Sequence, residues 1–384
     1  GTGHGNAAAG AALSLFLGPV VLVSHPYFDT RLKWDPDYQG KKDRVIAGRN
    51  AEAYLSAQLG ERTAELFFGS LDRNWGPPAL EGLLVSPSPY SYDHLGLAIG
   101  TPQGGIRLEG LLTQLDDLPD TSGTLNHRYF VAHRLVIRPP GRTTIALWEG
   151  TVLAGPDRQL EPWWANILTL GLLTQYDQGG AGNTLVGADV ATGIGSVGVF
   201  GSLLLDDIQI DDETPGDDEP PAYGLTLGAQ GALGAAAWTA YYTRVSNLAY
   251  RTPNPAEALM RRDVGLARNF ADYDQLSVSA SMIPARGALL TAHAVLLRQG
   301  EGDFRLPYPP VTAYDSTPAF LQGVVERTVR LGVGFQVSGA WWTLGGDGGV
   351  HFVRNAGHVS GASDTRWVGR LELTVRYRGE VAVP

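Results

Sequence analysis

Apolar and polar residues alternate with a period of two along much of this chain. Between residues 370 and 378 every second residue is apolar, and the residues between them are polar and mostly charged. The same alternation occupies residues 328–338 and 275–282. Successive side chains of a strand point to opposite faces, so this pattern predicts strands with one apolar and one polar face.

Strand-like segments are predicted from end to end, and they total roughly 16 to 18. Turn sequences such as residues 139–141 and 284–287 join many of them. No composition break or flexible linker separates them, so we expect one domain over residues 1–384. Besides the three above, the predicted strands are 11–23, 28–34, 51–59, the apolar parts of 64–86, 92–99, 106–115, 128–138, 143–149, 170–176, 184–190, 194–205, 223–230, 237–245, 289–299 and 341–353.

Longer connections interrupt these strands. Residues 157–167 could form one short helix, and residues 255–262 could form another inside a long loop at 253–272. The segment 206–221 is strongly acidic, 303–319 is Pro-rich, and 318–326 is a further possible helix. We expect these excursions to lie in loops or inside the fold.

A soluble β-sandwich and a transmembrane β-barrel both produce this alternation. About seventeen strands exceed one ordinary sandwich, and the polar faces carry Arg beside Glu and Asp, which could pair across an enclosed lumen. Trp and Tyr near predicted strand ends, such as Trp34, Trp75 and Trp148, suit interfacial girdles. We therefore predict an all-β protein, an antiparallel barrel of the bacterial outer membrane with lipid around it.

Composition agrees with a barrel and excludes other classes. The chain of 384 residues has no Cys and a net charge of −10, which argues against nucleic-acid binding. The longest apolar run, 11–23, is interrupted by Ser14, Gly18 and Pro19 and is too short for a transmembrane helix. The start has no basic signal region, so we expect a processed or trimmed chain.

The segment 64–86 has an unusual centre. An apolar run ends in Asp72, Arg73, Asn74 and Trp75, followed by Gly76, Pro77 and Pro78, and apolar residues resume at 83–85. Proline cannot donate to a ladder, so strand pairing must stop here. The cluster is either a sugar-binding corner beside an indole or a strand-end plug in which Arg73 pairs with a lumen carboxylate.

Residues 128–134 place Arg128 and Arg134 on one strand face and Tyr129 and His133 on the other. We expect the two arginines to form a basic lumen track with Arg73, and in an exporter Arg244 would also lie along the path. This track could meet an acidic polymer, or its arginines could pair with Glu149 and Asp189. A lipid-facing His133 would be costly, so it should lie near an interface or be turned inward by a bulge.

Other candidate chemistry is weak. Asp206, Asp207 and Gln209 begin an acidic run through residue 219, which could bind Ca²⁺ but lacks EF-hand spacing and is better explained as a solvated loop. The eight His are scattered, and no nucleophile motif occurs. We expect no enzyme activity, no metal site and no cofactor.

Several short motifs resemble the capsule assembly protein Wzi family. They are residues 68–77, 126–129, 161–166, 206–209 and 242–247, and the similarity runs from about Phe28 to Val375. The chain departs from that family at both ends: a long N-terminal helical region is not evident, and the last residues are Val381 to Pro384 rather than a terminal aromatic. The resemblance implies an outer-membrane barrel that binds capsular polysaccharide and helps retain it at the surface, as a lectin.

We therefore predict a monomeric outer-membrane barrel with a plugged or narrow lumen that binds surface polysaccharide, with loops 206–221 and 253–272 as candidate contacts. One alternative is a porin or exporter that passes an anionic polysaccharide or small solutes along an Arg-lined lumen. Another is a structural surface component without ligand specificity. The candidate binding or lumen residues are Asp72, Arg73, Asn74, Trp75, Arg128, Arg134, Glu149, Trp163, Trp164, Asn166, Asp206, Asp207, Gln209 and Arg244.

Overall fold

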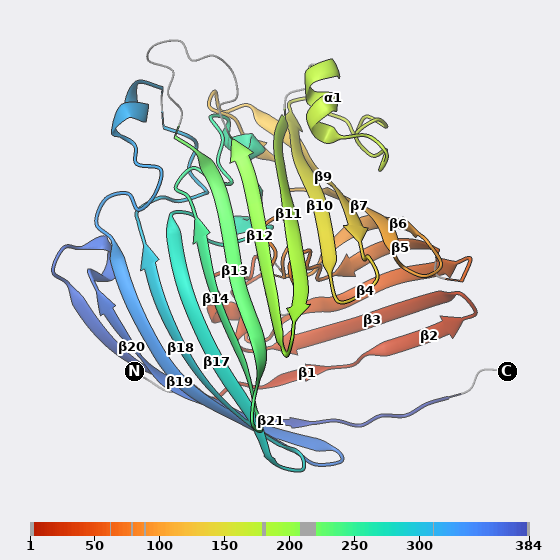
Figure 1. Cartoon of the computed structure of the whole chain (residues 1–384), viewed down its shortest axis with the longest axis vertical. Helices are drawn as coiled ribbons and strands as arrows, with labels where there is room; N and C mark the ends of the chain where they lie inside the picture. Colours follow the sequence, from red (N-terminus) through yellow and green to blue (C-terminus); the bar gives the residue numbers. More distant parts are fainter. Residues whose placement is uncertain are drawn as a thin grey trace.

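The computed structural model of the chain is built almost entirely from antiparallel strands (Figure 1). It describes residues 4–61, 63–77, 80–87, 90–178, 182–207, 220–309 and 311–381. The strands are β1 (Ala8–Gly10), β2 (Leu13–Leu17), β3 (Val20–Asp29), β4 (Ala47–Leu59), β5 (Ala64–Leu71), β6 (Tyr92–Gly100), β7 (Ile106–Gln114), β8 (Leu118–Pro119), β9 (Leu125–Ile137), β10 (Thr144–Gly155), β11 (Gly182–Ile194), β12 (Val197–Asp207), β13 (Ala222–Leu233), β14 (Ala236–Val245), β15 (Met260–Arg261), β16 (Val264–Gly265), β17 (Tyr273–Ala285), β18 (Ala288–Gln299), β19 (Glu326–Ser338), β20 (Trp342–Arg354) and β21 (Ser363–Val375). The α-helix is α1 (Gly171–Gln178), and short 3-10 helices occupy Leu32–Trp34, Pro255–Glu257, Val311–Ser316 and Ala356–His358.

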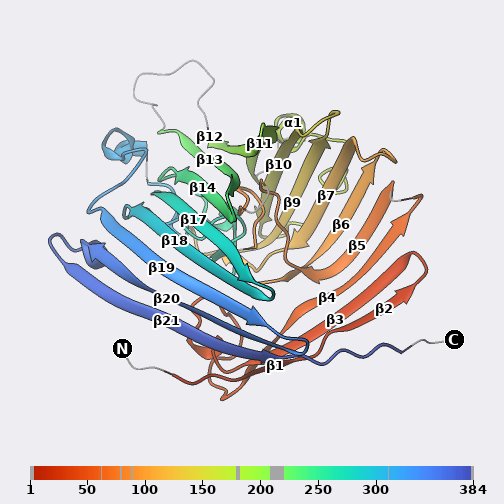
Figure 2. The ribbon, with the colours of Figure 1, turned by 60° about the horizontal axis from the view of Figure 1, so that its bottom comes forward.

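One sheet of 19 strands forms the wall, and most wall strands pair with their neighbours in sequence. β1 and β2 share one position beside β3, and β8 adds only two residues beside β9, so the wall falls within the predicted range of strand number. The sheet curves round until β21 and β1 lie at neighbouring edges (Figure 2). Arg31, just after β3, and Glu372 on β21 form an ion pair of 3.5 Å between these edges.

The two faces of the wall differ in polarity. In the middle of the sheet, Leu147, Ala188 and Leu203 stand at one register level across β10, β11 and β12, and both leucines are exposed. One residue along, Trp148 and Leu204 belong to the opposite face and are buried. We call the exposed apolar face the outer face and the opposite one the inner face. Outward apolar side chains are those expected of a barrel in lipid.

Connections differ at the two ends of the wall. Tight turns, such as the one at Gly195 with φ of +59°, close the hairpins at one end, here called the short-turn end. The long connections, including α1, gather at the other, the long-loop end (Figure 1). A left-handed φ is accessible to glycine at little cost, which explains why glycine occupies such turns.

Several predicted elements are wrong in detail. Residues 11–23 form a hairpin that turns at Gly18 instead of one strand, and residues 171–176 of the predicted strand 170–176 belong to α1. The segment 157–167 forms turns, residues 255–262 contain a 3-10 helix and β15, and 318–326 is not helical. None of the helices in the described part of the chain is long and apolar enough to cross a membrane.

Candidate functional site

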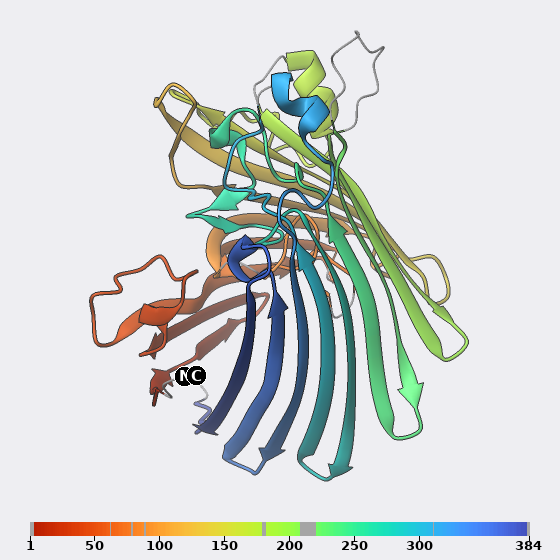
Figure 3. The ribbon, with the colours of Figure 1, turned by 90° about the vertical axis from the view of Figure 1, so that its left-hand side faces the viewer.

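Three connections, residues 72–77 with 80–87, 246–272 and 300–309, run inward at the long-loop end (Figure 3). Their apolar side chains fill the interior there. We call these connections the plug. Leu83, Leu84 and Val85 are fully buried in it, although the sequence suggested that they resume a strand. They pack with inner-face side chains of the wall, namely Phe130, Val152, Leu185 and Leu204. Each buried side chain of this size contributes about 1.5–3 kcal/mol, so the plug is a hydrophobic core.

The plug segments are fastened to one another by polar contacts. The Tyr250 hydroxyl donates to the Leu83 carbonyl at 2.8 Å, and the Ser86 amide donates to the Leu266 carbonyl at 3.0 Å. Arg268 pairs with Glu81 at 2.7 Å. The connection after β5 and the connection after β14 therefore form one packed unit.

The predicted cluster at residues 72–78 starts the plug. Asn74 donates to the Leu80 carbonyl at 2.7 Å and accepts from the Gly82 amide at 2.8 Å. The Trp75 amide donates to the Val85 carbonyl at 2.9 Å, and the Trp75 side chain is 6% exposed. Asp72 is exposed at the end of β5. The plug interpretation thus fits Trp75 and Asn74; Trp75, like Trp148, packs in the core and not in an interfacial girdle.

Arg128 fastens the plug to the wall and is not part of a lumen track, which corrects the prediction. Its side chain is 0% exposed. Nε donates to the carbonyl of Ala256 and Nη2 to that of Ala258, both at 2.5 Å, and Nη2 also reaches Met260 at 3.2 Å. Nη1 donates to the Asp116 carbonyl at 3.2 Å. Four of the five N–H groups of this buried Arg are bound to backbone carbonyls, so the side chain is committed to the fold and not to a lumen ligand.

Arg134 belongs to a belt of alternating charges on the inner face. Arg107 contacts Glu65 and Glu109, each at 2.8 Å, and Arg134 lies 3.7 Å from Glu109 and 3.8 Å from Asp189. Asp189 also accepts from the Trp148 indole at 3.0 Å and the Ser202 hydroxyl at 2.5 Å. Pairing between Arg134 and Asp189 was one of the predicted alternatives.

Arg73 behaves differently from these arginines. Its guanidinium lies over the Phe67 ring, 4.2 Å from the centroid, and Nε donates to His94 Nε2 at 2.9 Å. Within the described part of the chain, no carboxylate oxygen lies within 4.0 Å of it, so the predicted ion pair of Arg73 is wrong. Arg73 instead lines a small cavity of about 60 Å³ beneath the plug, which we call the Arg73 cavity.

His133 and Glu149 face outward but are covered. Their side chains form a pair at 2.9 Å and are each 9% exposed. The amide of Gly171, at the start of α1, donates to Glu149 at 2.6 Å. The connection 156–178 therefore lies over the outer face and hides this polar pair, so Glu149 does not meet Arg128 or Arg134. No bulge interrupts the pairing of β9 with β10 at His133.

The same connection carries three other predicted site residues to the outside of the wall. Trp164 packs on Val131 and Leu153, whereas Trp163 and Asn166 are exposed. They do not join Trp75, so the predicted cluster of these residues is wrong.

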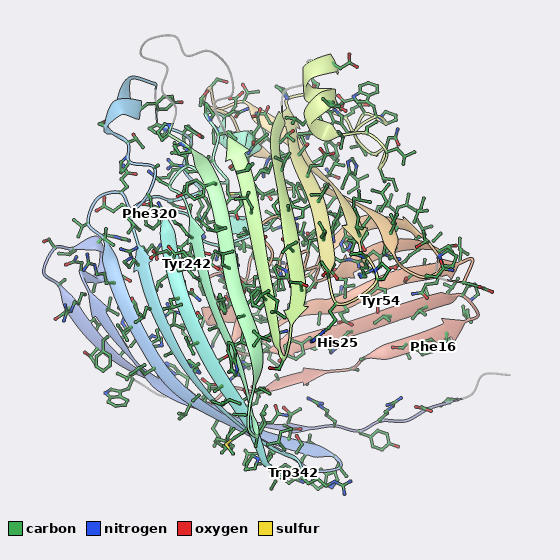
Figure 4. All side chains as sticks on the ribbon, viewed as in Figure 1. Phe16, His25, Tyr54, Tyr242, Phe320 and Trp342 are labelled. Carbon is green, nitrogen blue, oxygen red and sulfur yellow. The ribbon has the colours of Figure 1, made fainter. Side chains whose placement is uncertain are left out.

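Arg244 also lies outside the lumen. Its register partner is Leu225 on the outer face, and its guanidinium stands 3.8 Å from the Phe320 centroid. Figure 4 places Phe320 toward the long-loop end of Tyr242, the neighbouring outer-face side chain of β14. Asp206 accepts a hydrogen bond from the Tyr250 amide and supports the plug. The side chain of Asp207 and the whole of Gln209 lie outside the described residues.

A polar groove of about 640 Å³ opens at the long-loop end. We call it the mouth groove. It lies between the ends of β9 and β10, the connection after β10 and the 3-10 helix Pro255–Glu257. None of its residues was among the candidate binding residues, although Asn254 and Glu257 belong to the loop 253–272 that the sequence offered as a candidate contact. Its polar side chains are Asn126, Asp157, Arg158, Gln159, Glu161, Asn254 and Glu257.

Two interactions shape this groove. Arg158 pairs with Glu161 at 3.1 Å, and Asn254 donates to Glu257 at 3.1 Å. Burial raises the pKa of Glu257, while the Asn254 hydrogen bond and the Arg158 charge oppose that rise. The groove therefore offers carboxylate, amide and guanidinium groups at one surface, which suits hydroxyl-rich ligands.

No family model and no curated protein matches this sequence. Solved structures resemble it at low identity. Wzi of Escherichia coli, described as an outer membrane protein involved in group 1 capsule assembly and a carbohydrate-binding β-barrel, aligns with a TM-score of 0.64 and 12% identity, over 94% of this chain and 76% of its own. The outer membrane protein OprD of Pseudomonas aeruginosa aligns with a TM-score of 0.50 and 10% identity, over 96% and 86%. The chain therefore has the fold of bacterial outer-membrane β-barrels, which confirms the predicted fold class.

Proposed function

We propose that this barrel binds a surface polysaccharide at its long-loop end and does not serve as an open pore. The observation that carries the proposal is the plug, whose hydrophobic core spans the interior from Tyr92 on β6 to Tyr273 on β17. A porin needs a water-filled lumen, whereas here fully buried leucines occupy the centre. Because the lumen is closed, the loops at the long-loop end are the surface that remains for ligand binding.

The mouth groove is the proposed glycan site. In bacterial barrels the long loops face outward and the short turns face the periplasm, so we infer that this groove faces the cell exterior. Its mixed acidic, amide and guanidinium lining can donate to and accept from sugar hydroxyls. The likeness to a barrel described as carbohydrate-binding supports the same function, and capsule is the proposed class of polymer.

A glycan array on the purified, detergent-folded protein tests the proposal. We expect binding to one or a few polysaccharides, and about tenfold weaker binding after Asp157→Ala with Gln159→Ala, because hydrogen bonds to a charged group and an amide are lost. Asp43→Ala is the matched control: Asp43 is an exposed acid in another long-loop-end connection. A correctly folded barrel that binds no glycan, or groove variants that bind as well as the Asp43 control, would contradict the proposal.

A further inference from the structure

We propose that a row of arginines on the outer face of the wall binds the phosphate-bearing headgroup of an anionic membrane lipid. Strands β14, β17, β18, β19 and β20 run side by side (Figure 1). Successive register partners on the outer face of these strands form one row, which we call the arginine row: Arg244, Asp274, Arg298, Arg327 and Arg354. This inference concerns the lipid-facing surface and does not depend on glycan binding at the loops.

The tilt of the strands carries this row to the long-loop end. In the middle of the sheet, the same line of register partners passes through Leu147, Ala188, Leu203 and Leu225. Leu147 lies near the short-turn end of β10, whereas each member of the arginine row is one of the two residues nearest the long-loop end of its strand. Barrel strands tilt by about 35–45° from the barrel axis, so residues in register differ in height. The arginine row therefore follows the long-loop rim of the wall.

An apolar row lies directly below these charges. Two residues toward the short-turn end on the same five strands, and on the same face, are Tyr242, Leu276, Leu296, Val329 and Phe352, which are again successive register partners. All of them except Tyr242 are exposed. An outward apolar surface that ends in arginines suits the boundary between hydrocarbon and headgroups, where long cationic side chains reach the headgroups. A lipid can occupy both rows at once, which a soluble anion cannot.

The arginine row carries an excess of positive charge. Four arginines and one aspartate leave three positive charges, although the whole chain has a net charge of −10. Asp274 is used by Arg298, whose Nε and Nη2 donate to it at 2.9 and 2.5 Å. In the described part of the chain, Arg244, Arg327 and Arg354 have no carboxylate oxygen within 4.0 Å.

The acids next to the row in sequence have other partners. Glu326 accepts a hydrogen bond from the Gly357 amide at 2.7 Å, and Asp364 accepts one from Arg366 at 2.5 Å. Both acids stand one residue along their strands from the register line of the arginine row, so the alternation directs them to the inner face. They do not neutralise the arginines.

A phosphate would compensate the repulsion within the row. Arg298, Arg327 and Arg354 are consecutive register partners on strands about 4.8 Å apart, and like charges placed opposite one another destabilise a sheet. The planar fork of an Arg can bind two phosphate oxygens at once. At the other end of the row, the guanidinium of Arg244 lies 3.8 Å from the Phe320 ring centroid, which restricts its movement.

Titration of the folded barrel in detergent with short-chain lipids, followed by native mass spectrometry, tests this assignment. The probes are dioctanoyl phosphatidic acid, dioctanoyl phosphatidylcholine and glycerol phosphate. We expect phosphatidic acid to bind at least tenfold more tightly than phosphatidylcholine, whose choline neutralises the phosphate, and than glycerol phosphate, which has no acyl chains. Equal affinities for the two lipids would overturn the proposal. Glycerol phosphate binding as tight as phosphatidic acid would overturn the lipid assignment.

Two double variants separate the row from a general effect of charge. Arg327→Gln with Arg354→Gln should lower the affinity for phosphatidic acid at least tenfold and leave that for phosphatidylcholine unchanged. Arg138→Gln with Arg286→Gln is the matched control, because it removes the same charge from exposed positions at the short-turn end. The control should change the affinity less than twofold. Equal losses in the two double variants, or no loss in the first, would overturn the site.

Two further measurements separate this site from polysaccharide binding. Alginate, a soluble acidic polysaccharide, should not displace phosphatidic acid from the barrel; displacement would assign the row to a polymer and overturn the lipid proposal. The mouth-groove variant Asp157→Ala with Gln159→Ala should bind phosphatidic acid as tightly as wild type, and a tenfold loss there would contradict a site on the outer face. A barrel that binds no glycan would leave this proposal standing.

Discussion

Replacing Arg128 by Met removes the main fastening between plug and wall. Met preserves much of the apolar stem of Arg128 but supplies no donor, so the carbonyls of Ala256, Ala258, Met260 and Asp116 lose a shared partner. These carbonyls lie where the connection after β14 and the one after β7 meet the start of β9. The substitution should therefore loosen the plug and leave the strand pairing of the wall intact.

The size of the effect follows from the contacts. A hydrogen bond to a charged group contributes about 1.5–3 kcal/mol, and a buried carbonyl left without a donor costs about 1–3 kcal/mol. The four bonds share one guanidinium, so their contributions do not add fully. The desolvation cost of the buried Arg128 cation is also relieved, which reduces the net effect. We expect a loss of about 3–5 kcal/mol in the free energy of unfolding.

Urea unfolding in detergent, followed by tryptophan fluorescence, measures this loss, because Trp75 and Trp148 lie in the plug core. Arg354→Met is the matched control, since Arg354 is an exposed residue of β20. Hydrogen exchange over residues 256–260 should accelerate in the Arg128 variant alone. A variant within about 1 kcal/mol of the control, with unchanged exchange at 256–260, would refute the role given to Arg128.

Three further predictions concern single contacts. Trp75→Ala should destabilise the barrel by about 3–5 kcal/mol through the cavity it leaves, and loss of glycan binding without loss of stability would contradict its place in the plug. Glu149→Leu should cost about 1–3 kcal/mol in urea unfolding, whereas His133→Leu with Glu149→Leu should lie closer to wild type because neither partner is then left buried alone; a double variant at least as unstable as the single one would argue against this pair. Burial raises the pKa of Glu257, so the stability it contributes is present below its usual 4.5 and is lost as pH rises through the raised value. Glu257→Gln should accordingly be more stable than wild type at pH 8 and equal to it at pH 4, and the same difference at both pH values would contradict this assignment.

The wall of the barrel was predictable because its signal is local. Alternation along a strand reports which residues face lipid, and segments such as 275–282 and 328–338 kept their predicted alternation between the two faces. The same alternation predicted that Arg128 and His133 lie on opposite faces of their strand. The local sequence also predicted where strand pairing stops, because Pro77 has no backbone N–H to donate to a neighbouring strand.

The plug was not predictable because its partners are distant in sequence. Leu83 to Val85 show the same short apolar run as a strand, and nothing nearby reveals that they pack against Tyr250 and Leu266. Arg128 donates to backbone carbonyls near residue 258. Every residue has a backbone carbonyl, so the sequence does not indicate which ones Arg128 will bind. A polar pair on an outer face, as at His133 and Glu149, is tolerated only because the connection after β10 covers it.

The mouth groove was predicted only in part, for a related reason. Its polar residues come from the start of β9 and from two connections, after β10 and after β14, which meet only after folding, and each residue is ordinary in its own segment. The predicted site residues Trp163 and Trp164 belong to the same connection as the groove residues after β10. They lie on the outer side of the wall and not in the groove.

Planar-bilayer conductance of the wild-type barrel is the most direct test of the closed lumen on which the proposed function depends. A lumen occupied by the plug predicts no stable open level of porin size, at either polarity and over a range of salt concentrations. A folded, heat-modifiable barrel that shows a large and steady open conductance would contradict the plug as the resting structure and would favour transport through the lumen instead.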